Sequence, residues 1–384
     1  MSVVKGIAII LMVLGHAEAP WFITGFIYLF HMPVFFMAAG YFFSERYLSQ
    51  PWDFVVRRFK GLYLPFIKWS LMFLLLHNLM FAVGVLNEQY GNWTGGVTHP
   101  YSWRDMLQRA VHIVFSMGGY DEFLAGAFWF FRALLLSSLT YLVLRLVVRR
   151  VWPRAGGPVA ASIIICVLAL GFAVVKIAWN LKIVTVVQGG IRETWGVFFF
   201  SAGVLARYLG QWWRQNEGAM HGLVCRVAVP VAMVTAVALL WAGTAGHWAG
   251  MNLSPKLADV VTLPLTGVAG FFVLYRIAGF LVGRVSMAPL ASALAYVGAS
   301  TVYVYVFHIV AFKAVSLLKI WWFALDPAQI GCHMVIHDYA PADGFWVLYT
   351  IAGVGLPLLG LAAARQFGRQ WPRWAIIPRP EPRS

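Results

Sequence analysis

The chain has 384 residues, of which 61% are hydrophobic and only 11% are charged. A soluble domain carries about 25% charged residues, so this composition excludes an ordinary soluble enzyme and indicates an all-α bundle of membrane-spanning helices. The net charge of +15 would also suit a nucleic-acid-binding protein, but the basic residues flank apolar runs, so no nucleic-acid partner is expected.

Apolar runs of about 17–25 residues predict roughly ten spanning helices. In chain order they lie at 4–20, 22–43, 61–86, 127–148, 157–178, 190–208, 224–243, 260–281, 294–316 and 344–364. We expect one membrane domain, residues 1–370, followed by a disordered cytoplasmic tail, residues 371–384. The apolar spacing of residues 103–116 predicts a further, amphipathic helix at the membrane interface.

The loops alternate between rich and poor in lysine and arginine. The basic loops include 44–60 and 149–156, and the intervening ones include 87–126 and 317–343. Because basic loops tend to stay in the cytoplasm, both chain termini are expected there, and the loops 87–126 and 317–343 are expected on the outer side.

Three histidines inside predicted helices stand out: His16 in the first, His31 in the second and His308 in the ninth. With a rise of about 1.5 Å per residue, all three reach a similar depth near the middle of the bilayer. An ionisable residue in hydrocarbon marks a functional site, although a lone histidine more often joins two helices by a hydrogen bond. His16 is the favoured functional residue, since the neighbouring Gly15 permits close approach of a ligand.

Other charges also fall within apolar runs. Arg132 lies inside the fourth predicted helix, which favours a role in the polar layer of the bundle. Arg192 and Glu193 open the sixth helix from the outer side, where the alternative is that they snorkel to the interface.

Three cations precede the third predicted helix on its cytoplasmic side: Arg57, Arg58 and Lys60. The plain interpretation is a flank that sets topology. The sharper one is a clamp for the phosphates of a nucleotide donor, because arginine forks match phosphate oxygens and lysine adds a point charge.

Short motifs follow one another along most of the chain, at 5–16, 30–33, 40–43, 57–65, 129–134, 203–207 and 298–308. Their order and spacing resemble the membrane-bound acyltransferase-3 family, the integral membrane O-acyltransferases that modify bacterial surface and exported sugars. Within that family the opening is most similar to the fucose-4-O-acetylase-like branch.

The resemblance implies His16 as the catalytic residue and Lys5, which precedes it by eleven positions, as its functional partner. It likewise implies that Arg57 and Lys60 belong to a donor-binding element of the form Arg-x-x-Arg. In both motifs a lysine stands where relatives often carry arginine, which keeps the charge and loses the bidentate geometry.

The resemblance further implies a multi-pass protein of the bacterial cytoplasmic (inner) membrane. Its donor substrate would be an acyl-CoA, by default acetyl-CoA, with no permanently bound cofactor. Its acceptor would be a carbohydrate: an exopolysaccharide, a lipopolysaccharide or a lipid-linked sugar. His16 would act as a general base or take the acyl group covalently, and both routes remain open.

Two other functions compete with this one. A proton-coupled transporter or flippase of a lipid-linked sugar would use the same histidine layer, but the sequence shows neither an inverted repeat nor paired interrupted helices. A scaffold would use the histidines only to join helices. The three cysteines, Cys166, Cys225 and Cys332, predict no disulfide and no metal site.

Overall fold

A computed structural model of the chain describes residues 1–91, 99–121, 123–181, 190–216, 227–251, 255–335 and 343–367. Within these ranges the chain is helical and has no strand, which confirms the all-α fold class. The helices are α1 (Ser2–Gly15), α2 (Trp21–Tyr28), α3 (His31–Tyr41), α4 (Pro51–Arg58), α5 (Leu64–Ala82), α6 (Trp103–Ser116), α7 (Trp129–Val151), α8 (Pro158–Ala178), α9 (Ile191–Gln215), α10 (Val229–Ala245), α11 (Asp259–Val282), α12 (Ala288–Ala299), α13 (Thr301–Trp322) and α14 (Phe345–Phe367).

Seven helical stretches of the described residues are long and apolar enough to cross a membrane. They are Trp21–Tyr41, Pro51–Ala82, Trp129–Val151, Pro158–Ala178, Asp259–Val282, Thr301–Trp322 and Phe345–Gln366. The polytopic membrane bundle is therefore confirmed. The number of about ten spans and the cytoplasmic termini stay predictions, and the predicted tail, residues 371–384, lies outside the described residues.

The predicted helix 22–43 is interrupted, because α2 ends at Tyr28 and α3 begins at His31. Pro33 explains the break: in a continuous helix its ring would meet the carbonyl of Leu29, whereas the first turn of a new helix tolerates proline. The carbonyl of Leu29 instead accepts a hydrogen bond from Thr266 Oγ1 at 3.3 Å. The break places His31 at the start of α3.

The predicted helix 294–316 is also interrupted, at Ser300, between α12 and α13. The first of these helices packs on α1 and the second on α14. A Cβ at Gly298 would lie 1.8 Å from the carbonyl oxygen of Ser2, and one at Gly6 would lie 2.0 Å from that of Leu294. Only glycine permits this backbone contact, which fixes α12 against the first helix.

The third predicted helix, 61–86, begins earlier than expected. It runs through α4, a π-helical turn at Phe59–Tyr63 and α5. A π turn inside an α-helix is frequent at functional sites. Here the turn contains Lys60 and directly follows Arg57 and Arg58.

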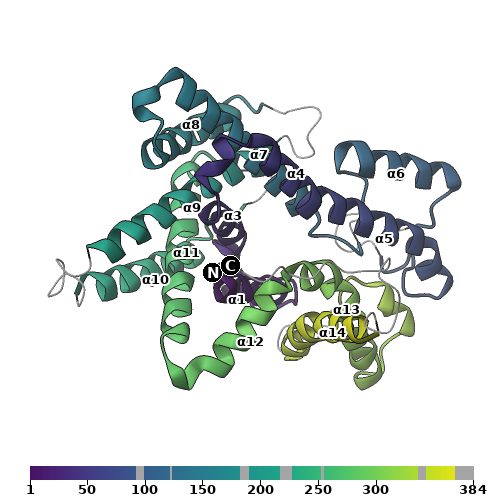
Figure 1. Cartoon of the computed structure of the whole chain (residues 1–384). Coiled ribbons are helices and arrows are strands. Elements are labelled where there is room, and N and C mark those ends of the chain that lie inside the picture. The colour runs from purple at the N-terminus through teal and green to yellow at the C-terminus, as the bar shows by residue number, and fades with distance from the viewer. Residues whose placement is uncertain are drawn as a thin grey trace.

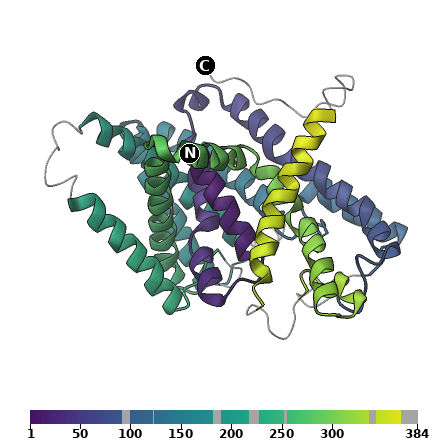
Figure 2. The same ribbon diagram turned by 90° about the horizontal axis from the view of Figure 1, so that it is seen from below.

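The central helices α1 and α3 are surrounded by the others, with α10 and α11 on one side and α5, α6, α13 and α14 on the other (Figures 1 and 2). The helix α9 packs along α3 through a second glycine contact. A Cβ at Gly40 would lie 1.9 Å from the carbonyl oxygen of Phe200, and one at Gly203 would lie 2.0 Å from that of Met37. Close packing of small residues is how membrane helices associate without a hydrophobic driving force.

The amphipathic helix expected at 103–116 is present as α6. Ser102 caps it, since its hydroxyl accepts a hydrogen bond from the backbone of Asp105, whose carboxylate accepts one from the backbone of Ser102. Its exposed apolar residues are spaced by one turn: Trp103, Leu107, Val111 and Phe115. Its position at a membrane interface stays a prediction.

Candidate functional site

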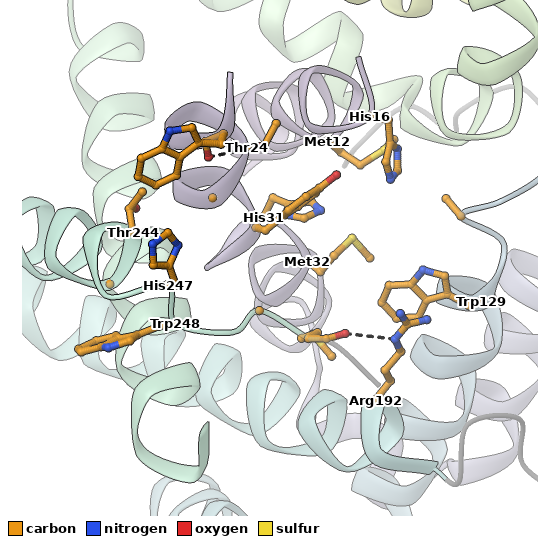
Figure 3. A pocket seen from close by; sticks show the side chains of 17 residues that line it. Met12, His16, Thr24, His31, Met32, Trp129, Arg192, Thr244, His247 and Trp248 are labelled. Atoms are coloured by element: carbon orange, nitrogen blue, oxygen red, sulfur yellow. Dashed lines mark hydrogen bonds between the residues drawn. The ribbon is translucent and has the colours of Figure 1, made fainter. Parts of the chain in front are cut away.

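A cavity of about 520 Å³ lies where α1, α2, α3, α9 and the segment after α10 meet. Aromatic side chains form much of its wall, including Trp21, Trp129 and Trp248. Imidazoles, two threonine hydroxyls and one guanidinium enter it from different helices (Figure 3). An apolar cavity with a few convergent polar groups is the usual form of a small-molecule site.

His16 lies at the end of α1, where its backbone N–H still bonds to Met12 and Val13. Its Nδ1 is 3.1 Å from Nε2 of His308 on α13, and the two rings stack with centroids 5.2 Å apart. The sequence-based expectation that these two histidines occupy one layer therefore agrees with the geometry.

The hydrogen bonds fix which nitrogens carry the protons when both rings are neutral. His308 Nδ1 is 2.9 Å from the carbonyl oxygen of Tyr305, which can only accept, so this nitrogen donates. His308 Nε2 must then accept from His16 Nδ1–H. His16 Nε2 is left with a free lone pair, and no described residue bonds to it.

His31 lines the same cavity. Its Nδ1 donates to the carbonyl oxygen of Ile27 at 3.0 Å, so the neutral ring also keeps a lone pair on Nε2. Tyr28, whose ring lies 5.2 Å from that of His31, donates from its hydroxyl to the carbonyl oxygen of Gly15 at 2.6 Å. This bond holds the turn that carries His16.

A further histidine near this pair, His333, lies in the loop between α13 and α14. Burial, with smaller contributions from the nearby His16 and Lys313, lowers its pKa to about 3. An imidazole with so low a pKa is neutral near pH 7. His333 therefore adds no positive charge beside the pair of His16 and His308.

Arg132 and Glu193 form a buried ion pair between α7 and α9, with Nε and Oε1 3.2 Å apart. Neither residue lines the cavity. Their expected place in a substrate-binding or structural polar layer stays a prediction. Lys5 is near the start of α1, about 16 Å along the helix from His16, and does not touch it. Its assigned partnership with His16 stays a prediction.

The expected donor cluster lies at the opposite end of α3 from the cavity. Arg58 sits over the rings of Phe54 and Phe200, at 4.8 Å and 5.5 Å from their centroids. Phe43, which contacts both of these rings, follows His31 by twelve residues, or about 18 Å of mostly helical chain. Arg57 and Lys60 are exposed.

Sequence reasoning missed several cavity residues. Arg192 was assigned no site role, although it is the one cation among the described lining residues. Trp21, Trp129 and Trp248 lie in or beside apolar runs, where interfacial tryptophans are common. No signal in the sequence brings together residues so far apart in the chain.

Within the described chain Cys166 and Cys332 are free thiols, Cys225 lies outside it, and the expected absence of a metal stays a prediction.

The model of the acyltransferase domain family matches residues 1–365. The chain belongs to the acyltransferase-3 family. Comparison with curated proteins and with solved structures gave no match. Together with the apolar helices, membership of the acyltransferase-3 family makes the protein a multi-pass membrane acyltransferase. The fucose-4-O-acetylase-like branch stays a prediction.

Membership of the acyltransferase-3 family also decides between the competing functions. The sequence argument against a transporter counted the absence of paired broken helices in corresponding positions. The structure shows two breaks, one before α3 and one before α13. Each break lies in a helix that carries a histidine of the layer. The pattern of helices alone does not distinguish an enzyme from a transporter. The match to the acyltransferase family supports an enzyme.

Proposed function

We propose that this acyltransferase moves an acetyl group from cytoplasmic acetyl-CoA to a hydroxyl of a carbohydrate bound in the cavity, across the bacterial inner membrane. The observation that carries the proposal is the free Nε2 lone pair of His16, held toward the cavity by the hydrogen bond from Nδ1 to His308. A neutral imidazole in a fixed tautomer is suited to take a proton from a bound hydroxyl.

The proton transfers balance around one nitrogen. His16 Nε2 takes the proton of the sugar hydroxyl as its oxygen attacks the thioester carbonyl carbon. The carbon–sulfur bond then breaks, and the departing CoA sulfur receives that proton from His16 Nε2. During the step the imidazolium keeps its Nδ1–H bond to His308, which limits rotation of the ring.

The donor would bind at the other end of α3. Arg57 and Lys60 are exposed cations on neighbouring turns, and Arg58 is held between them by two aromatic rings. Such a group can bind the phosphates of CoA, while the thioester arm extends along α3 toward His16. The separation of about 18 Å along the helix suits one extended molecule that reaches both places.

The covalent route uses the same lone pair and remains the alternative chemistry. In it His16 Nε2 attacks the thioester and CoA leaves as the thiolate. The hydroxyl then attacks the acyl carbon, the carbon–nitrogen bond to Nε2 breaks, and the hydroxyl proton passes through the freed Nε2 to the thiolate. Rapid quenching of the enzyme with labelled acetyl-CoA and no acceptor separates the two routes. Label that stays on the denatured protein and is lost in His16→Gln supports the covalent route.

The proposed function is tested with the full chain purified into lipid nanodiscs. Release of CoA from acetyl-CoA is measured with and without a mixture of simple sugars. The wild type should consume acetyl-CoA, and His16→Ala should lower the rate by about 10²–10⁴-fold, the usual contribution of a general base. The matched control is His112→Ala, since His112 is exposed on α6 and outside the cavity. Full activity in folded His16→Ala would overturn the catalytic assignment.

A further inference from the structure

Arg192 is held in an unusual way at the wall of the cavity. Its Nε donates to the backbone carbonyl of Met251 at 3.1 Å, and its guanidinium lies 4.0 Å from the centroid of the Trp129 ring. These two contacts fix the plane of the group, as Figure 3 shows. Its two terminal nitrogens carry four N–H donors, and no described residue accepts a hydrogen bond from them.

The neighbouring acid acts on this charge only through space and makes no hydrogen bond to the guanidinium. Glu193 follows Arg192 in the chain, but its carboxylate pairs with Arg132 on α7. None of the described residues that line the cavity is a carboxylate. A cation between aromatic walls, with its fork of donors open to the cavity, therefore has no carboxylate hydrogen-bonded to it in the described part of the protein.

A cationic fork without a partner is expensive to keep in a partly buried site, unless a ligand supplies the missing anion. Arginine presents two parallel N–H donors, which match the two oxygens of a carboxylate. The stacked Trp129 and the bond to Met251 hold the fork in place before the ligand binds, which reduces the entropy lost on binding.

We propose that the acceptor is an acidic saccharide, whose carboxylate binds the terminal nitrogens of Arg192 while its ring packs against the tryptophans of the cavity. This inference rests on the proposed function only in calling the saccharide the acceptor of the acyl group. Binding of an acidic saccharide at Arg192 does not itself require the transfer reaction. Anchoring by Arg192 would present one hydroxyl of the sugar ring to His16.

The inference is tested by direct binding to the full chain in nanodiscs, measured by calorimetry with three defined probes. Methyl β-D-glucuronide carries the carboxylate, methyl β-D-glucoside lacks it, and sodium acetate carries the charge without the ring. The glucuronide should bind about 10–100-fold tighter than the glucoside, the range expected for charge-assisted hydrogen bonds. Acetate alone should bind more weakly than the glucuronide.

The variants locate the effect. In Arg192→Gln the advantage of the glucuronide should disappear, and in Arg192→Lys it should shrink, since lysine keeps the charge without the fork. The matched control is Arg104→Gln, which removes an exposed cation on α6 outside the cavity. It should leave the binding of every probe unchanged.

Several results would overturn the inference. It fails if neither sugar binds, if the two sugars bind equally to the wild type, or if the glucuronide keeps its advantage in Arg192→Gln. It also fails if Arg192→Gln leaves binding intact and slows transfer to both sugars alike, because Arg192 would then stabilise the reacting oxyanion. Preferential binding without any consumption of acetyl-CoA would overturn the proposed function and leave this inference standing.

Discussion

Two sets of polar groups inside the bundle differ in how their bonds are completed. Away from the cavity, several buried charges occur as pairs, such as His77 with Asp121, Arg145 with Glu45, and Arg132 with Glu193. In the residues that line the cavity, the Nε2 atoms of His16 and His31 and the terminal nitrogens of Arg192 have no hydrogen bond to a described residue.

The difference separates structural from functional polarity. A paired charge has its partner in the protein, so its removal should cost stability and leave the chemistry of each folded molecule intact. A group that is fixed on one side and open on the other is oriented for something outside the protein. Its removal should cost activity and leave stability nearly unchanged.

The largest effect on stability is expected from the buried pair of His77 and Asp121. Asp121 accepts from His77 Nδ1 at 2.5 Å and from the backbone N–H groups of Phe123 and Leu124. His77 also donates from Nε2 to the carbonyl oxygen of His99, and its ring stacks on Tyr101. Asp121→Ala should destabilise the protein by about 3–5 kcal/mol, as expected when one partner of a buried pair is removed.

This loss is measured by thermal unfolding in detergent, together with acetyl-CoA consumption per folded molecule at low temperature. The matched control is Glu88→Ala, which removes an exposed acid from the neighbouring loop and should change stability by less than about 1 kcal/mol. The distinction between paired structural charges and open functional groups is contradicted if Asp121→Ala is as stable as the wild type. It is also contradicted if Asp121→Ala folds well but loses its activity.

The next effect concerns the donor cluster. Arg57→Ala or Lys60→Ala should raise the apparent constant for acetyl-CoA by about 10–100-fold, since a charge-assisted phosphate contact contributes about 1.5–3 kcal/mol. The constant for the acceptor should change little. Initial rates at varied donor and fixed acceptor measure the effect.

Lys60→Arg serves as the conservative control for this cluster, because the charge remains. Arg149→Ala is the matched negative control, since Arg149 is an exposed cation in the last turn of α7. Wild-type donor affinity in both alanine variants would reduce the cluster to a topology signal.

The sequence predicted the fold class because apolar composition over twenty residues is sufficient to place a helix in a membrane. It did not predict the breaks at Leu29–Phe30 and Ser300, since both lie inside continuous apolar runs. Pro33 was a visible cue for the first break. The second depends on the contact of α12 with α1, which no local pattern reveals.

The histidine layer was predictable because helical rise converts position into depth, and depth alone brought His16, His31 and His308 together. Direction around a helix was not predictable. The sequence therefore placed Arg132 and Glu193 in the polar layer and could not show that they pair with each other, while Arg192 faces the cavity. Which of two adjacent charges reaches a ligand depends on packing between helices.

A smaller effect is expected at the bond that orients His16. His308→Ala removes the acceptor for His16 Nδ1–H, a bond that contributes about 0.5–1.5 kcal/mol, so kcat should fall by about two- to tenfold. The KM for the acceptor should stay the same, because His308 does not line the cavity. His308→Gln should recover part of the loss, since its side-chain carbonyl can accept the same hydrogen bond.

A purely structural His308 predicts a different pattern. Loss of the hydrogen bond would then lower the unfolding temperature of His308→Ala with no change in kcat for the folded fraction. Steady-state kinetics and thermal unfolding of the same preparations distinguish the two. An unchanged kcat would remove His308 from the proposed mechanism.

The smallest effect is a pH dependence confined to α6. Hydrogen bonds from the side chain and the backbone N–H of Ser102 hold the pKa of Asp105 below its ordinary value of 3.8. A carboxylate whose pKa is lower in the folded state stabilises the fold above its unfolded pKa, and that contribution is lost as pH falls through the folded value. Between pH 6 and pH 5 the cap should therefore be unaffected, and below about pH 4 it should weaken.

Amide hydrogen exchange of α6 at matched intrinsic rates measures this loss, with Ser102→Ala as the reference in which the cap is already broken. Protection in α6 should fall toward that of the variant as the pH drops, while protection in the central helix α3 stays constant. Because Asp105 lies at the surface, water and salt screen the effect, so it should be small. Equal protection in the wild type and Ser102→Ala at pH 6 would show that the cap does not hold α6, and that its packing on α5 does.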